Sequence, residues 1–233
     1  ILRGLVGSEM CIRDSHGTAP WMQDKSRPGI IPSDNDHVIK VKWNDIDSLS
    51  EILDKYSDQI ACFISSPYDH PVSRDNSLPA DDYWKKVTNL CKKHDVLTIV
   101  DDVRAGFRIN LKGSNVAFGF SPDMICFGKA IANGHPLASL VGNNDLKKSA
   151  EKVYFTGTQF FSAPPMAAAL ATLKELQKLD APNRLIEYGN RLNQRLVKVA
   201  SEEGFNLIAS GMPSMPYYRC LLYTSPSPRD LSE

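Results

Sequence analysis

Several features that would restrict the function of this chain are missing from it. No apolar run is long enough to cross a bilayer as a helix, so no transmembrane segment is expected. Neither sign of charge is in excess, because 27 lysines and arginines balance 27 aspartates and glutamates. We therefore expect neither nucleic acid nor a membrane surface as a partner. The hydrophobic content of 42% and the charged content of 23% are ordinary and fit a cytoplasmic enzyme.

Cysteine and histidine are also scarce, with five of each in 233 residues. The histidines are scattered. Cys62, Cys91 and Cys126 lie far apart and lack the spacing of a metal site. We expect them to be buried, reduced thiols of a reducing compartment, and we expect no metal site.

Two short apolar runs end in polar residues of complementary chemistry. Leu97–Val100 stops at an acidic pair that begins with Asp101, and Met124–Phe127 is followed by a glycine and Lys129. Buried strands of a parallel sheet have this pattern where their carboxyl ends open onto a ligand crevice. Two neighbouring strands of this kind would direct Asp101 and Lys129 into one crevice.

Each signal has a plainer explanation when it is taken singly. An acidic pair after a strand commonly caps a helix or lies in a solvated loop. A lysine after a glycine is commonly a surface residue whose stem covers apolar neighbours. Together, a carboxylate and an amine held in one crevice are what a pyridoxal phosphate enzyme requires. The carboxylate keeps the pyridine nitrogen protonated, and the amine attaches to the cofactor and moves a proton.

Three motifs stand in order along the chain: Asp-Asp-Val-Arg-Ala-Gly-Phe-Arg at 101–108, Pro-Asp-Met-Ile-Cys-Phe-Gly-Lys at 122–129, and Gly-Thr before an alanine-rich segment at 157–170. This stretch resembles the class III (subgroup II) pyridoxal phosphate aminotransferases, which include ornithine and 4-aminobutyrate transaminases and glutamate-1-semialdehyde aminomutase. The resemblance implies an α/β fold: part of a fold-type-I large domain, with a mostly parallel, seven-stranded type of sheet flanked by helices.

The resemblance also implies roles for individual residues. Lys129 would form the Schiff base with pyridoxal 5'-phosphate, and an apolar setting would keep its amine neutral for attack. Asp101 would pair with the pyridinium nitrogen. Val103, two residues on and on the same face of an extended segment, would pack against the ring. Thr158, after Gly157, would donate its hydroxyl to the cofactor phosphate from the neighbouring subunit of a homodimer, although a threonine here also suits a helix cap.

The chain departs from the family pattern in ways that affect the substrate. Ser66 stands where family members commonly carry a glutamate, and a neutral hydroxyl cannot hold a partner arginine. This resembles the aminomutase-like branch. Tyr68 and His70 follow in the same loop, and a hydrogen-bonded loop histidine is favoured over one that faces the substrate. Asp102 in place of glutamate and Ala105 in place of threonine are milder departures. Ser162 and Ala163 replace the asparagine and proline of the family's Gly-Asn-Pro-Leu.

The two ends are expected to be foreign to the protein. Glu9–Asp14 can be encoded by GAGATGTGTATAAGAGAC, a transposase end used in preparing sequencing libraries. The reverse complement of that DNA, extended by AG and read one base along, encodes Cys-Leu-Leu-Tyr-Thr-Ser, which stands at 220–225. Ends related in this way are unusual in natural proteins, so we expect residues 1–15 and 220–233 to derive from adapter.

Between those ends, 16–182 is expected to be part of the cofactor-binding large domain, and 183–219 to be a linking helix and the start of a C-terminal small domain. The glycine- and serine-rich turn that binds the cofactor phosphate in this family would lie before His16. The chain is therefore expected to carry the lysine, the aspartate and the dimer-facing threonine, but only part of the pocket.

Periodicity predicts strands that alternate with helices, which favours a mostly parallel sheet. The predicted strands are 37–43, 60–64, 97–100, 124–127 and 138–142, with a polar loop at 65–79. The predicted helices are 46–56, 82–94, 145–150, 163–178 and 183–204, the last with Leu185, Leu192, Leu196 and Val199 on one stripe.

These observations predict a transaminase that moves an amino group from an amino compound to a keto or aldehyde acceptor through Lys129. An intramolecular amino shift of the glutamate-1-semialdehyde type is the first alternative. A non-catalytic protein of the same fold, or an inactive fragment, is the second.

Overall fold

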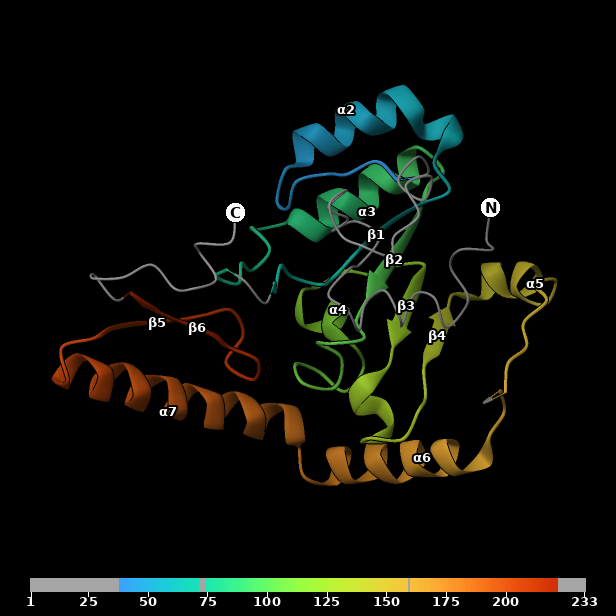
Figure 1. Cartoon of the computed structure of the whole chain (residues 1–233). Coiled ribbons are helices and arrows are strands. Elements are labelled where there is room, and N and C mark those ends of the chain that lie inside the picture. Colours follow the sequence, from blue (N-terminus) through green and yellow to red (C-terminus); the bar gives the residue numbers. More distant parts are fainter. Residues whose placement is uncertain (1–37, 72–73, 159, 222–233) are drawn as a thin grey trace.

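The computed structural model describes residues 38–71, 74–158 and 160–221. Its main sheet has four strands in the order β1-β2-β3-β4 (Figure 1). The strands are β1 (Cys62–Ser65), β2 (Leu97–Asp101), β3 (Met124–Phe127) and β4 (Ser139–Gly142). The first three are parallel, and β4 runs antiparallel to β3. The carboxyl ends of β1, β2 and β3 therefore meet at one edge, as the apolar runs predicted.

The helices follow the strands in alternation. They are α2 (Ile46–Tyr56), α3 (Tyr83–Lys93), α4 (Ser114–Ala117), α5 (Lys147–Ala150), α6 (Ala163–Lys178) and α7 (Ala181–Glu202). Short 3-10 turns are η4 (Ser57–Gln59), η5 (Lys129–Ala132) and η6 (Asn144–Leu146). A hairpin of β5 (Asn206–Ser210) and β6 (Tyr217–Leu221) follows α7.

Helices α2 and α3 pack together on the sheet and form the largest core (Figure 1). At its centre the ring of Trp84 stacks on Phe120, with centroids 4.2 Å apart and an interplanar angle of 5°. The Trp84 indole Nε1 also donates a 2.8 Å hydrogen bond to the carbonyl of Pro67. This bond ties the loop after β1 to α3. Cys91 is buried in the same core.

Helix α6 supports the turn after β3. Its Ala169 packs in one cluster with Ile131 and Ala132 of η5 and with Phe107 and Phe127. The small alanine allows close approach of the two backbones. Because η5 begins at Lys129, α6 braces the backbone that carries this lysine.

Helix α7 packs one side against the β5–β6 hairpin. A Cβ atom at Gly189 would lie 1.9 Å from the carbonyl oxygen of Pro213, so only glycine allows this approach. The Tyr218 hydroxyl donates a 2.6 Å hydrogen bond to Oδ1 of Asn193. The predicted apolar stripe lies beside this contact, with Leu185, Leu196 and Val199 exposed among the described residues.

Most predicted elements are confirmed, with shifts of a few residues at their ends. Helices 46–56 and 163–178 have the predicted bounds, and the helix expected from 183 begins at Ala181. The strand predicted at 37–43 is wrong for the part that the structure describes, 38–43. Val41 and Trp43 point inward because they pack on the α2–α3 core, so the alternation reflects this packing and not a sheet partner.

The predictions for the two ends of the chain concern residues that lie largely outside the described ranges. Residues 1–15 and 222–233, expected to derive from adapter, lie there together with His16. Cys220 and Leu221 are described and form the last two positions of β6, opposite Leu207 and Asn206. In the described part of the chain, no helix combines the length and apolar character needed to cross a membrane.

Candidate functional site

The candidate site lies at the carboxyl edge of the parallel strands. Asp101 is the last residue of β2, and in the β2–β3 register it stands opposite Cys126. Lys129 follows β3 by two residues. The two residues proposed for catalysis therefore end neighbouring parallel strands at one edge of the sheet, as the sequence predicted.

Asp101 is held in a defined position. Its residue is only 6% exposed, and its Oδ1 accepts a 3.0 Å hydrogen bond from the backbone amide of Val103. A carboxyl group this buried is retained where polar or cationic partners satisfy it, because its desolvation is otherwise costly. Asp101 thus has the burial and the rigidity of a group that meets a buried cation.

Val103 connects the two strand ends. It is buried, and a Cβ atom built on Gly128 would lie 3.1 Å from its Cγ1. Val103 therefore packs against the backbone directly before Lys129. It lies in a turn and not in an extended segment, so the prediction that it shares a face with Asp101 by strand alternation is wrong. The hydrogen bond from its amide to Asp101 sets its position instead.

Lys129 has an unusual backbone conformation. Its φ of +46° lies in the left-handed region, which costs a non-glycine residue about 1–3 kcal/mol and is concentrated at functional sites. Residue 129 is exposed in the described chain, while Gly128 before it and Ile131 after it are buried. The apolar setting expected around the Lys129 amine therefore stays a prediction.

The sequence did not predict the role of Asp102. This residue is 1% exposed, and its carboxyl group accepts hydrogen bonds from the Ser114 hydroxyl at 2.6 Å and the Ser114 amide at 2.7 Å. Burial raises the pKa of Asp102 to about 6, although both hydrogen bonds from Ser114 act in the opposite direction. Its carbonyl accepts from the amide of Gly106 at 2.8 Å. Asp102 thus anchors the turn that carries Val103.

Gly157 and Thr158 lie apart from these residues in the fold. Both are exposed, on the loop before α6. Among the described residues, no heavy atom lies within 4 Å of a Cβ atom built on Gly157. The same loop exposes Tyr154 and Phe161. The structure therefore leaves Thr158 on the surface of one chain.

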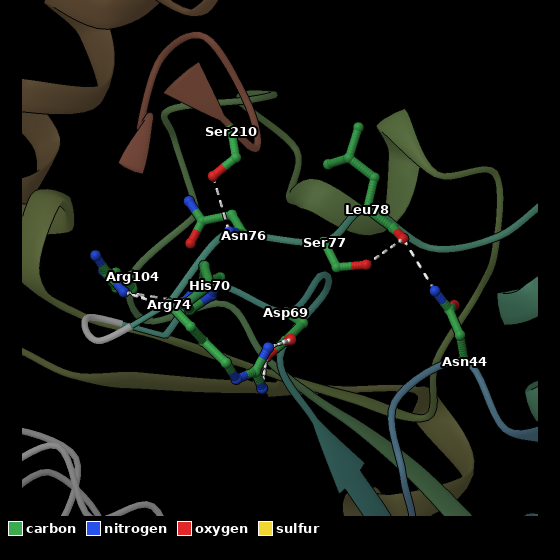
Figure 2. A network of polar contacts seen from close by, with 9 residues as sticks. All are labelled: Asn44, Asp69, His70, Arg74, Asn76, Ser77, Leu78, Arg104 and Ser210. Atoms are coloured by element: carbon green, nitrogen blue, oxygen red, sulfur yellow. Dashed lines mark hydrogen bonds and ion pairs between the residues drawn. The ribbon is translucent and has the colours of Figure 1, made fainter. Parts of the chain in front are cut away.

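The loop after β1 carries a polar network (Figure 2). The Arg104 guanidinium donates to the His70 carbonyl and lies 3.2 Å from His70 Nδ1. Arg74 pairs with Asp69 in the same loop. His70 is therefore a hydrogen-bonded loop histidine, as favoured from the sequence, and its partner Arg104 comes from the turn after β2. No sequence signal singled out Arg104.

Tyr68 belongs to the core. It is fully buried, and its ring packs edge-on against His70 with centroids 4.7 Å apart. Burial raises the pKa of Tyr68, and the charges of Arg104 and Arg108 partly offset that rise. The hydroxyl has no hydrogen-bond partner among the described residues.

Comparison with known proteins decides the family. The family model described as Aminotransferase class-III matches residues 24–210. The chain belongs to this family. The membership predicted from three motifs is confirmed, and so is the fold-type-I α/β architecture, which is shared with solved aminotransferases.

Three relatives illustrate the similarity. The aminopentol aminotransferase of Sphingopyxis macrogoltabida is 35% identical over 86% of this chain and 47% of its own length. The glutamate-1-semialdehyde 2,1-aminomutase of Legionella pneumophila (strain Paris) is 31% identical over 82% of this chain and 45% of its own. The structure of the PLP internal aldimine form of the Sphingopyxis sp. MTA144 FumI protein is 34% identical, with a TM-score of 0.82 over 88% of this chain and 50% of that one. This chain thus spans about half the length of the relatives it matches.

The part of the chain that the structure describes contains no group of three or more histidine, cysteine, aspartate or glutamate side chains arranged to hold a metal ion. Cys91 and Cys126 are buried as expected, whereas Cys62 is half-buried.

Proposed function

We propose that the protein containing this chain is a pyridoxal 5'-phosphate-dependent transaminase in which Lys129 and Asp101 are the catalytic residues. The observation that carries this proposal is the placement of the two residues at the ends of adjacent parallel strands, one of them buried and fixed by a backbone amide. Family membership supports it.

The residues present fit the cofactor. A protonated pyridine nitrogen is a flat, buried cation, and Asp101 offers a buried carboxylate of defined orientation. Val103 presents an apolar side chain between Asp101 and the backbone before Lys129, which suits the face of an aromatic ring. When bound, the cofactor supplies an electron sink for the bond that breaks at the substrate carbon.

Each residue then has a defined task. With the cofactor bound, the Lys129 amine would hold it covalently and, when released, would move a proton between the substrate carbon and the cofactor carbon. Asp101 keeps the ring nitrogen protonated throughout. Val103 fixes the plane of the ring, and the strained backbone at Lys129 limits the directions from which its amine approaches.

We assign the exposed loop with Gly157 and Thr158 to the contact with a second subunit. We propose a homodimer in which the Thr158 hydroxyl of one subunit donates to the cofactor phosphate held by the other. The exposure of the loop supports this, and Thr158 does not cap α6 in its own chain, because the N-cap position of that helix is Ser162. The reduced, buried thiols make the cytoplasm the proposed compartment.

The substrates are a small amino donor and a keto or aldehyde acceptor. An intramolecular amino shift is a second candidate, favoured by Ser66 in place of the family glutamate and by the 31% identity with an aminomutase. The two reactions differ in stoichiometry. A transaminase needs a separate acceptor, whereas an amino shift proceeds with one substrate alone.

Absorbance of the reconstituted full-length protein tests the proposal. We expect the visible band of covalently bound cofactor in the wild type, its loss in Lys129→Ala, and its retention in Lys152→Ala, which removes an exposed lysine elsewhere. Asp101→Asn should retain bound cofactor and lose at least about 100-fold in kcat, since the ring is no longer held protonated. A wild type without the band, or Asp101→Asn at parental activity, would contradict the proposal.

A further inference from the structure

The turn that follows Asp101 presents two arginines from an otherwise buried segment. Residues 103 and 105–107 are buried, whereas Arg104 and Arg108 are half-buried. The turn packs on Tyr68 through Ala105. The charges of Arg104 and Arg108 both act to lower the pKa of the Tyr68 hydroxyl, against the effect of burial. The Nε atom of Arg108 is itself buried, with no hydrogen-bond partner among the described residues.

Hydrogen bonds hold the Arg104 guanidinium in place, but no carboxylate of the described residues neutralises its charge. Its Nη1 is engaged by the carbonyl and Nδ1 of His70, which are uncharged acceptors when the imidazole is neutral (Figure 2). No carboxylate of the described residues forms an ion pair with it. The nearby Asp69 is taken by Arg74, with Nη2 of the arginine 3.2 Å from Oδ1. Asp102 is occupied by Ser114.

A half-buried guanidinium without a counter-charge is costly, and its planar fork suits a carboxylate. The residue that could supply an internal carboxylate at the end of β1 is Ser66 in this chain. An anion that neutralises Arg104 would therefore bind next to the turn that begins at Asp101, beside the proposed site of reaction. A carboxylate of the substrate could supply this negative charge.

We propose that Arg104, positioned by His70 and reinforced by the charge of Arg108, binds the carboxylate of the amino donor and of the keto acceptor. This inference rests on the proposed function and deepens it by naming the substrate class: amino acids and keto acids, in preference to simple amines and aldehydes. Arg104 makes the contact, and His70 is a positioning residue.

Kinetics of the full-length protein with matched substrate pairs test this inference. The pairs are L-alanine against 2-aminopropane as donors and pyruvate against propanal as acceptors, which differ in the carboxylate. In Arg104→Met we expect KM for alanine and pyruvate to rise about 10- to 100-fold, while values for 2-aminopropane and propanal change less than about 3-fold. Arg104→Lys keeps the charge without the planar fork and should give an intermediate increase.

Arg74→Met is the matched control, because it removes an exposed, ion-paired arginine of the same loop and should leave both pairs unchanged. Equal effects of Arg104→Met on substrates with and without a carboxylate would overturn the inference. So would parental KM values in the variant.

A binding measurement separates this inference from the proposed function. Calorimetric titration with propanoate, an unreactive carboxylate, should show binding to the wild type and a dissociation constant raised at least 10-fold in Arg104→Met at an unchanged unfolding midpoint. If the wild type transfers no amino group but this difference is found, the proposed function fails and the anion site stands. If transfer occurs and propanoate binds both proteins equally or neither, the assignment of Arg104 is wrong.

Discussion

The hydroxyl of Ser114 donates a 2.6 Å hydrogen bond to Oδ1 of Asp102, twelve residues earlier in the chain, while the Ser114 amide holds Oδ2 at 2.7 Å. Both residues are almost completely buried. This contact closes the segment that begins at the end of β2 and contains Val103 and Arg104. The geometry of the candidate site therefore depends on a pair of residues outside it.

Removing the hydroxyl should weaken this closure. In Ser114→Ala the amide still donates to Asp102, but a buried carboxyl oxygen loses its partner, which costs about 1–3 kcal/mol. We expect this loss in the free energy of unfolding, measured by urea titration of the full-length protein. Ser149→Ala, at an exposed position of α5, should change it by less than about 0.5 kcal/mol. Equal stability of the two variants would show that the Ser114 contact does not contribute.

The raised pKa of Asp102 determines the direction in which folding stability changes with pH. The pKa is about 6 in the folded protein and 3.8 as the ordinary value, so between these pH values the folded state binds more protons than the unfolded state. Stability contributed by this group is thus highest at low pH and falls as the pH rises from about 4 to about 6, by roughly 3 kcal/mol. Above pH 6 the effect is constant.

Replacing Asp102 by asparagine should remove this dependence of stability on pH. The test is a series of urea titrations of the wild type and of Asp102→Asn from pH 4 to pH 7. As the pH rises, the unfolding free energy of the wild type should fall relative to that of the variant. Asp145→Asn, at an exposed carboxylate, serves as the control. A difference that is constant across this range would mean that Asp102 does not titrate as described.

The contact between Gly128 and Val103 predicts a coupled pair. Gly128 has φ −168°, an extended conformation open to any residue, so the effect of Gly128→Ala is steric alone. The added methyl group would press on Val103 at 3.1 Å and cost about 1–2 kcal/mol. Val103→Ala relieves the clash, so the double variant should be more stable than the sum of the single changes by about 1 kcal/mol. Additive effects would show that the residues do not touch.

The close approach of α7 to the hairpin gives a fourth prediction. In Gly189→Ala the new methyl group would overlap the backbone of Pro213, which cannot yield as a flexible side chain can. We expect a loss of about 1–3 kcal/mol, although alanine favours helices over glycine by about 1 kcal/mol. Asn190→Ala, on the exposed side of α7, should be neutral or stabilising in the same thermal unfolding experiment. A stabilised Gly189→Ala would contradict the packing described here.

The sequence predicted those parts of the structure that depend on local pattern. The helical spacing in 46–56 and the apolar runs before Asp101 and Lys129 each encode an element. The order of motifs predicted the family, which the comparison confirmed. The roles of Lys129, Asp101, Val103, Gly157 and Thr158 remain predictions, because they concern a cofactor and a second subunit.

Contacts between distant residues could not be predicted in this way. Ser114 reaches Asp102 across twelve residues, and Arg104 reaches His70 across thirty-four, and neither pair has a periodic signal. In residues 38–43 a local pattern was present, but it was assigned to the wrong kind of element. Their alternation was genuine, but alternation does not reveal whether a segment packs on helices or pairs with a strand.

The deep position of Cys91 makes it a natural probe of unfolding. Burial raises its pKa to about 11, so at pH 8 only roughly one thiol in a thousand is in the reactive thiolate form. The thiol is also shielded by the core between α3 and the sheet. Alkylating reagents should therefore reach Cys91 only through transient opening of this core, so that mass spectrometry of the labelled peptide would report how often the core opens.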